Sequence, residues 1–208
     1  HVMGILNVTP DSFSDGGRHN SKDMAVAHAK QMIADGATVI DVGGESTRPG
    51  ASAVDVAEEI RRVVPVVEAL SKLDVVISID TSQPEVIQAT VQAGAHIWND
   101  VRALTRPQAL ETAARLNIPV IIMHMRGEPT TMNQLDQYDD VTHDVIGEIQ
   151  QRVDDALSAG VKEENILIDP GFGFAKNAQQ NLRLLNEFYR LNGLGYPILS
   201  ALSRKRFI

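Results

Sequence analysis

Seven short apolar segments in this chain each run directly into polar or glycine residues, and this pattern limits the fold more than any other feature. A strand that is buried on both faces is apolar along its length, so polar groups collect where the strand ends. In a β/α barrel all of these strand ends share one face. The segments cover residues 3–11, 39–50, 77–81, 97–100, 121–125, 166–174 and 199–205. The pattern therefore predicts parallel strands whose polar ends build one shared site.

Segments with helical periodicity separate the predicted strands. They cover residues 23–34, 56–73, 84–92, 107–116, 141–157 and 178–191. Strands that alternate with helices indicate an α/β fold with parallel pairing and right-handed crossovers. An open, doubly wound sheet is the alternative, since it accepts any number of strands. We favour a TIM (β/α)8 barrel, because polar residues follow every predicted strand. A complete barrel has eight strands, so this chain is expected to cover about seven of them.

Length and composition limit the class of protein. The 208 residues, of which 43% are hydrophobic, predict a single domain over residues 1–208. A net charge of −8 argues against nucleic acid and against an anionic membrane surface as partners. The chain has no cysteine and no apolar run long enough for a membrane helix, so we expect a cytoplasmic protein.

The first strand end carries Asn7, followed by a long loop with carboxylates at Asp11 and Asp15. A loop of this composition suits a lid, and the Asn7 amide oxygen is the kind of hard ligand that Mg²⁺ accepts. Alternatively, Asn7 and Asp11 only satisfy backbone groups of a turn.

The second strand end, residues 43–50, combines small residues and hydroxyl groups with Arg48. The Arg48 guanidinium could bind a phosphate or carboxylate through two hydrogen bonds. The alternative is a solvated surface arginine.

Asp80, Asn99 and Asp169 end the third, fourth and sixth predicted strands. In a barrel they would offer hydrogen-bond acceptors to a flat heterocycle rich in N–H groups. Each could instead cap a helix or form a turn.

Residues around the later strand ends extend this prediction. Gly173 lets the backbone approach a ligand, and Phe174 and Met123 could lie against a flat ring, although either could belong to the core. His124 could donate a hydrogen bond in the site or be satisfied structurally. The cations of residues 203–206 follow the last strand and predict recognition of an anion or a ring, unless they form a solvated charge run.

These segments together resemble the dihydropteroate synthase family of the folate pathway, the target of sulfonamides. The resemblance spans essentially the whole chain, and its first two motifs are highly specific. Its motifs are residues 3–17, 41–50, 78–81, 99–100, 123–125, 169–174 and 203–205.

The resemblance implies a TIM-barrel transferase that condenses 6-hydroxymethyl-7,8-dihydropterin diphosphate with 4-aminobenzoate, giving 7,8-dihydropteroate and pyrophosphate. It implies catalytic roles for Asp15, Arg48 and Lys205, and contact between Asn7 and a Mg²⁺ ion on the diphosphate. The residues that it implies in substrate binding are Phe13, Thr47, Pro49, Asp80, Asn99, Met123, Asp169, Gly173, Phe174, Ser203, Lys205 and Arg206. The expected partners are these small molecules and a second copy of the chain in a homodimer.

Two departures from the family pattern keep alternatives open. Family members continue into an eighth strand whose Arg-x-His helps bind the diphosphate, whereas this sequence ends at Ile208. Arg206 stands where some relatives have a serine that contacts the 4-aminobenzoate carboxylate, so the resemblance implies that this contact comes from Arg206 or from backbone N–H groups of a helix start. We therefore consider an inactive pterin-binding fragment, and also a pterin-binding methyltransferase barrel, although the long first loop and residues 46–49 argue against the latter.

Overall fold

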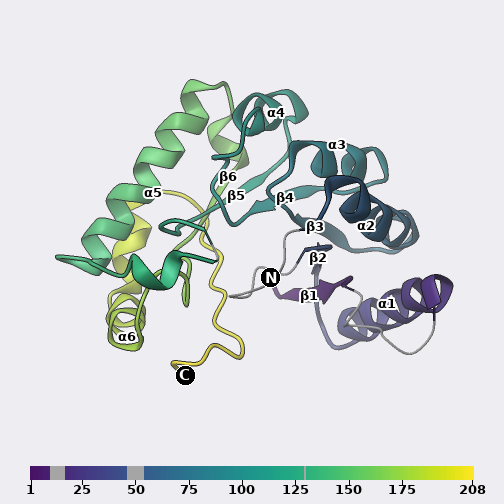
Figure 1. Ribbon diagram of the computed structural model, residues 1–208, viewed down its shortest axis with the longest axis horizontal. Helices are drawn as coiled ribbons and strands as arrows, with labels where there is room; N and C mark the ends of the chain where they lie inside the picture. Colours follow the sequence, from purple (N-terminus) through teal and green to yellow (C-terminus); the bar gives the residue numbers. More distant parts are fainter. Residues whose placement is uncertain (10–16, 46–53, 129) are drawn as a thin grey trace. The chain divides into compact units, whose positions relative to one another are not determined.

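The computed structural model describes residues 1–9, 17–45, 54–128 and 130–208. It contains two compact units, one that extends to Asn99 and one that runs from Asp100 to Ile208 (Figure 1). The prediction of a single domain over residues 1–208 stays a prediction. Asp15, Arg48, Phe13, Thr47 and Pro49 lie outside the described residues.

The first unit is a parallel sheet with one helix after each of its first three strands. Its strands are hydrogen-bonded in chain order, β1 to β2 to β3 to β4. Figure 1 shows α1, α2 and α3 following one another along one side of these strands. The elements are β1 Met3–Asn7, α1 Gly17–Ala34, β2 Val39–Gly43, α2 Val56–Leu70, β3 Val76–Asp80, α3 Pro84–Gln92 and β4 Ile97–Asp100.

The sequence of these strands explains their two faces. Successive side chains of a strand point to opposite sides of the sheet. Ile40, Val42, Ile77, Ile79 and Trp98 lie on one side and are fully buried. The other side of the sheet carries polar or small residues toward the carboxyl ends of the strands, so it is the side that holds the predicted site residues.

The second unit contains two strands with parallel pairing, β5 and β6, whose register places Met123 opposite Asp169. Helix α5 packs against β5, α4 and α6. The Asp140 side chain caps α5, and Asn177 caps α6 in a capping box with Gln180. The elements are α4 Ala109–Leu116, β5 Val120–Met123, η2 Met132–Gln134, α5 Val141–Ser158, η3 Glu163–Asn165, β6 Ile166–Asp169, α6 Ala178–Asn186 and η4 Phe188–Leu194.

The α/β prediction is confirmed, but the seventh predicted strand, residues 199–205, is not a strand in the structure: a single parallel bridge joins Ile168 to Ile198, one residue before it. The two backbone hydrogen bonds of this bridge are donated by Ile168 to Pro197 and by Leu199 to Ile168. Further along, Lys205 donates its backbone N–H to the Leu202 carbonyl, and Arg204 has a left-handed φ of 58°. This segment therefore turns where the sequence predicts a strand end.

Candidate functional site

The first unit brings three of the predicted site residues into one row across the sheet. Asn7 pairs with Gly43, Gly43 with Asp80, and Asp80 with Asn99 in the strand register. Residues paired in this way in a parallel sheet point to the same side. The row lies at the carboxyl ends of the four strands, where ligands of α/β sheets bind.

Gly43 keeps the middle of this row open. A Cβ atom at Gly43 would lie 3.6 Å from Asp80 Oδ2 and 3.7 Å from Asn7 Oδ1. A side chain there would fill the space beside both oxygen atoms. The glycine therefore leaves two oxygen-bearing side chains facing a shared gap.

Asp41 lies two residues before Gly43 on the same side of β2 and orients Asn99. The Asn99 side-chain amide donates a hydrogen bond of 3.0 Å to Asp41 Oδ2. Asp41 is only 5% exposed, and burial raises its pKa, although the neighbouring Ser78 and Asn99 side chains oppose the rise. Because the amide nitrogen is bonded to Asp41, the amide oxygen is the acceptor that Asn99 can offer to a ligand.

The second unit holds Asp169 at the end of β6. Asp169 is 3% exposed, and its Oδ1 accepts a hydrogen bond of 2.7 Å from the backbone N–H of Gly171. The Asp169 carbonyl accepts another, of 2.8 Å, from the His124 backbone. Gly171 has a φ of +67°, and a Cβ atom there would lie 1.9 Å from the His124 carbonyl oxygen. The turn after Asp169 therefore requires glycine.

Gly173, Phe174 and Lys205 form a second contact in this unit. A Cβ atom at Gly173, whose φ is +79°, would lie 3.2 Å from Lys205 Cδ. The Lys205 ammonium lies 4.5 Å from the centroid of the Phe174 ring. Burial lowers the pKa of Lys205, and Asp169 opposes that shift. The structure thus brings together three residues that the sequence predicts in substrate binding.

A network of charged groups lies beside these residues. His124 Nε2 and Glu148 Oε2 are 3.0 Å apart, and Arg126 Nε donates to Glu148 Oε1 at 2.9 Å. The Arg126 guanidinium also stacks on the Tyr138 ring, 3.8 Å from its centroid. Burial would raise the pKa of Glu148, but hydrogen bonds from His124 and Arg126 outweigh it and lower the pKa to about 2. Glu148 is therefore a carboxylate at neutral pH.

His124 is neutral in this network. Burial, reinforced by the charge of Lys176, lowers the pKa of His124 from 6.5 to about 4. The imidazole is 4% exposed and bonded at both ring nitrogens, to Glu148 and to Lys176. Of the two interpretations of His124, the structure favours a histidine satisfied by its protein partners.

Acidification from about pH 7 to about pH 5 is expected to lower the free energy of unfolding through His124. Because the pKa of His124 is lower in the folded chain than in the unfolded chain, the unfolded chain binds more protons between pH 6.5 and about 4. The stability is therefore lost as the pH falls through this window, by about 1 to 2 kcal/mol at pH 5. Urea unfolding at both pH values measures the loss.

The variant His124→Asn should show a smaller dependence on pH than the unmodified chain. His143→Asn is the matched control, since the His143 side chain is 78% exposed. An equal dependence on pH in the unmodified chain and in both variants would contradict the assignment to His124.

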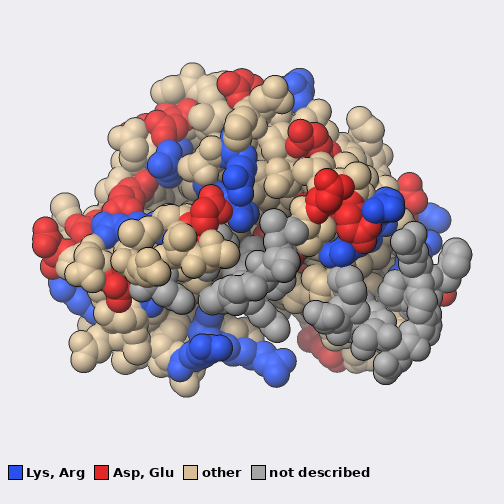
Figure 2. Space-filling model, viewed as in Figure 1, with Lys and Arg blue, Asp and Glu red and all other residues tan. Residues whose placement is uncertain are grey.

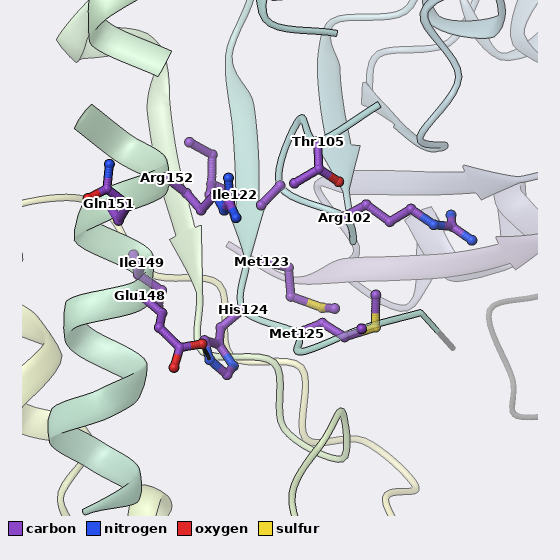
Figure 3. A pocket seen from close by; sticks show the side chains of 12 residues that line it. Arg102, Thr105, Ile122, Met123, His124, Met125, Glu148, Ile149, Gln151 and Arg152 are labelled. Carbon is purple, nitrogen blue, oxygen red and sulfur yellow. Dashed lines mark hydrogen bonds and ion pairs between the residues drawn. The ribbon is translucent and has the colours of Figure 1, made fainter. Parts of the chain in front are cut away.

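A cavity of about 220 Å³ lies beside the end of β5. Figure 3 shows Met123, His124 and Met125 from β5 and the segment after it, with Glu148 and Arg152 on α5 and Arg102 on the other side. Met123 is 3% exposed. The predicted ligand residue Met123 thus lies at a cavity as well as opposite Asp169.

Ser203 and Arg206 lie in exposed turns near the end of the chain. Figure 2 shows basic side chains gathered where the C-terminal segment of Figure 1 lies.

Among the described residues, no group of three or more His, Cys, Asp and Glu side chains could hold a metal ion. No helix in the described ranges is long and apolar enough to cross a membrane.

Sequence reasoning did not single out Asp41, Glu148 or Lys176 as site residues. The sequence itself could have indicated Asp41, since it is a carboxylate inside an apolar strand. No local sequence pattern indicated Glu148 or Lys176, because their partners come from distant parts of the chain. Phe172 belongs to the core, where its ring lies 6.1 Å from that of Phe188.

Residues 3–208 match the family model of the pterin binding enzymes. The dihydropteroate synthase of Escherichia coli (strain K12) is 53% identical over all of this chain, which covers 74% of that protein. The dihydropteroate synthase of Bacillus subtilis (strain 168) is 50% identical, and the chain covers 71% of it. The chain therefore spans about three quarters of the length of these relatives.

Solved structures agree with the sequence matches. The dihydropteroate synthase of Xanthomonas albilineans, solved with 4-aminobenzoic acid, has a TM-score of 0.92 and 50% identity, with 99% of this chain and 73% of that chain covered. The Yersinia pestis enzyme in a complex with a sulfonamide drug has a TM-score of 0.93 and 50% identity, with 99% and 75% covered. This likeness is consistent with the predicted TIM-barrel class.

Proposed function

This chain belongs to the dihydropteroate synthase family of pterin-binding enzymes, and we propose that it condenses 6-hydroxymethyl-7,8-dihydropterin diphosphate with 4-aminobenzoate. The products are 7,8-dihydropteroate and pyrophosphate, so the enzyme is a transferase of folate biosynthesis. The observation that carries this function is 53% identity over the full chain to a dihydropteroate synthase. The Xanthomonas albilineans relative, solved in complex with 7,8-dihydropteroate and separately with 4-aminobenzoic acid, supports the same reaction.

The reaction needs no nucleophile from the protein. The aniline nitrogen of 4-aminobenzoate attacks the pterin methylene carbon, the C–O bond breaks, and the diphosphate leaves with the electron pair. The attacking nitrogen then loses a proton. Protein groups are left to bind and orient the two substrates and to exclude water.

The proposed pterin ligands are the acceptor groups at the strand ends. Asp80 and Asn99 stand in one row of the first unit, and Asp41 turns the Asn99 amide oxygen toward a ligand. In the second unit, Asp169 offers its carboxylate, while Lys205, Gly173 and Met123 supply further contacts. A carboxylate that faces two adjacent N–H groups makes a two-point contact. These roles suit the donor-rich edge of a pterin ring.

The remaining substrate roles follow from the family resemblance. We propose that Asp15 and Arg48 act in the two loops that close over the substrates. Phe13, Pro49 and Phe174 are proposed to form the 4-aminobenzoate pocket, with Thr47 in the second loop. Ser203 and Arg206 are proposed to contact the substrates, with Arg206 at the 4-aminobenzoate carboxylate.

We also propose Mg²⁺ as the cofactor, with Asn7 as its protein ligand. The Asn7 amide oxygen is a hard ligand at a strand end and faces the open space beside Gly43. This oxygen ligand fits Mg²⁺, which usually keeps few protein ligands and takes the rest from phosphate oxygens and water. When bound, the ion would neutralise charge on the diphosphate leaving group.

Chelation of Mg²⁺ with EDTA is expected to lower the rate of 7,8-dihydropteroate formation at least about tenfold, because charge on the leaving group is no longer neutralised. Excess Mg²⁺ should restore the rate. The variant Asn7→Ala should raise the Mg²⁺ concentration that gives half of the maximal rate. An unchanged rate in EDTA would contradict the proposed cofactor.

The experiment that tests the function is formation of 7,8-dihydropteroate from the two substrates by the purified chain. Product would distinguish the synthase from an inactive pterin-binding fragment and from a methyltransferase barrel, since neither forms this product. Folded protein that binds the pterin and forms no product would overturn the proposed activity.

We further propose a homodimer, on the strength of the family resemblance, and a cytoplasmic location, as expected from the sequence. Sedimentation analysis of the purified chain would test the oligomeric state, and a monomer at all concentrations would contradict it.

A further inference from the structure

Lys176 is a buried lysine whose ammonium group has three acceptors. It is 9% exposed. Its Nζ donates to the Gly171 carbonyl at 3.0 Å and to the Phe174 carbonyl at 3.0 Å, and it lies 2.9 Å from His124 Nδ1. An ammonium has three N–H donors, so each of these contacts uses one. The side chain therefore ties the segment after β6 to the end of β5.

The segment that Lys176 ties has three residues with positive φ, and one of them, Ala175, is strained because it carries a Cβ atom. Gly171 and Gly173 have positive φ values of 67° and 79°, and Ala175 has a φ of 48°. For a residue with a Cβ atom, the left-handed region costs about 1 to 2 kcal/mol. Such a conformation persists only when its surroundings hold it. Lys176, directly after Ala175, is placed to do so.

Asn181 holds the other side of the same segment. Its Oδ1 accepts a hydrogen bond of 2.8 Å from the Gly173 backbone, and its Nδ2 donates to the Lys176 carbonyl at 3.0 Å. Asn181 is 2% exposed. Two buried side chains, Lys176 and Asn181, thus hold residues 171–174 through hydrogen bonds, and neither is among the predicted ligand contacts.

Stability alone does not explain a lysine at this position. Burying an ammonium costs free energy that an apolar side chain of similar volume does not cost. Burial lowers the pKa of Lys176 to about 7, while the charges of Asp169 and Glu148 oppose this shift and those of Lys205 and Arg126 add to it. A methionine could fill the space at lower cost, so the hydrogen bonds are the property that distinguishes lysine.

We propose that Lys176 is a positioning residue for pterin binding, which holds residues 171–174 so that Asp169 and Gly173 keep the geometry that receives the pterin ring. Its partner His124 accepts at Nδ1 because the other ring nitrogen donates to Glu148. Glu148 thereby fixes the imidazole, and the imidazole helps to fix the lysine. The pterin contacts in this inference rest on the proposed function.

The first experiment compares pterin binding to the unmodified chain, to Lys176→Met and to Lys162→Met. Methionine keeps the volume of the side chain but donates no hydrogen bond. Lys162 is an exposed lysine in the same unit and serves as the control. Calorimetry with 6-hydroxymethyl-7,8-dihydropterin diphosphate should show a Kd at least about tenfold higher for Lys176→Met, equivalent to about 1.4 kcal/mol. Lys162→Met should match the unmodified chain.

The second experiment measures backbone hydrogen exchange in the absence of ligand. The amides of Gly171, Gly173 and Phe174 should exchange faster in Lys176→Met than in the unmodified chain, while amides of α5 keep their rates. If the unmodified chain binds no pterin, the proposed function fails, whereas the exchange rates still decide whether Lys176 holds this segment. Lys176→Gln, which keeps a donor, replaces the methionine variant if that variant does not fold, with the same direction expected.

The pH dependence separates positioning from a general structural role. Above pH 7 the neutral amine keeps only two N–H donors, so pterin affinity should fall in the unmodified chain with a dependence that Lys176→Met lacks. Lys205 also faces Asp169, and Lys205→Arg, which does not titrate in this range, should retain the dependence. The proposal would be overturned if folded Lys176→Met had the same pterin affinity, the same pH profile and the same amide exchange rates in residues 171–174 as the unmodified chain.

Discussion

Replacement of Asp169 by asparagine is expected to weaken pterin binding by about 100-fold or more. The asparagine oxygen can still accept the hydrogen bond from the Gly171 backbone, which the structure gives as 2.7 Å to Asp169 Oδ1. The second carboxylate oxygen becomes an NH₂ group, which would face the N–H donors of the ring. A hydrogen bond to a charged group contributes about 1.5 to 3 kcal/mol, and the new contact between two donors adds to this loss.

Calorimetry with the pterin diphosphate measures this effect, and thermal unfolding checks that the variant is folded. Asp139→Asn is the matched control, because Asp139 is an exposed aspartate of the same unit. The control should bind the pterin as the unmodified chain does. Equal affinity in Asp169→Asn and in the control would remove Asp169 from the pterin site.

The strand ends could be predicted because their signal is local. Asn7, Asp80 and Asn99 each follow an apolar run, and the parallel register then places them in one row. The sequence alone could not reveal the hydrogen bond between Asn99 and Asp41, since 58 residues separate them. An aspartate inside a strand is visible in the sequence, but its partner becomes known only when the register is known.

The parts that sequence reasoning missed depend on contacts between distant segments. Lys176 meets His124, which lies 52 residues earlier, and the apolar residues near Lys176 do not indicate that its side chain is buried. The pattern of the run that begins at Leu199 predicts a strand. The chain nevertheless forms backbone hydrogen bonds with β6 only around Ile198 and then turns at Arg204. Whether an apolar run forms a strand depends on the neighbour that it pairs with, and composition does not encode that neighbour.

Replacement of Gly171 by alanine is expected to destabilise the protein by about 3 kcal/mol or more. The new Cβ would lie 1.9 Å from the His124 carbonyl oxygen, and a backbone atom cannot move aside as the end of a flexible side chain can. The φ of +67° adds strain for any residue with a Cβ atom. A loss of this size is exceptional for one methyl group and is a large part of the stability of a typical domain.

Gly147→Ala is the matched control and should have the opposite sign. Gly147 lies inside α5, and a Cβ atom there would meet nothing within 4 Å. Alanine in a helix interior is better than glycine by about 0.5 to 1 kcal/mol, so urea unfolding should show a small gain. The Gly171 backbone N–H donates to Asp169, and the added Cβ would displace it, so any Gly171→Ala protein that folds should also bind the pterin more weakly, whereas Gly147→Ala should bind normally. Similar stability in the two variants would show that the segment after β6 moves freely enough to accept a side chain, which contradicts a segment held by Lys176 and Asn181.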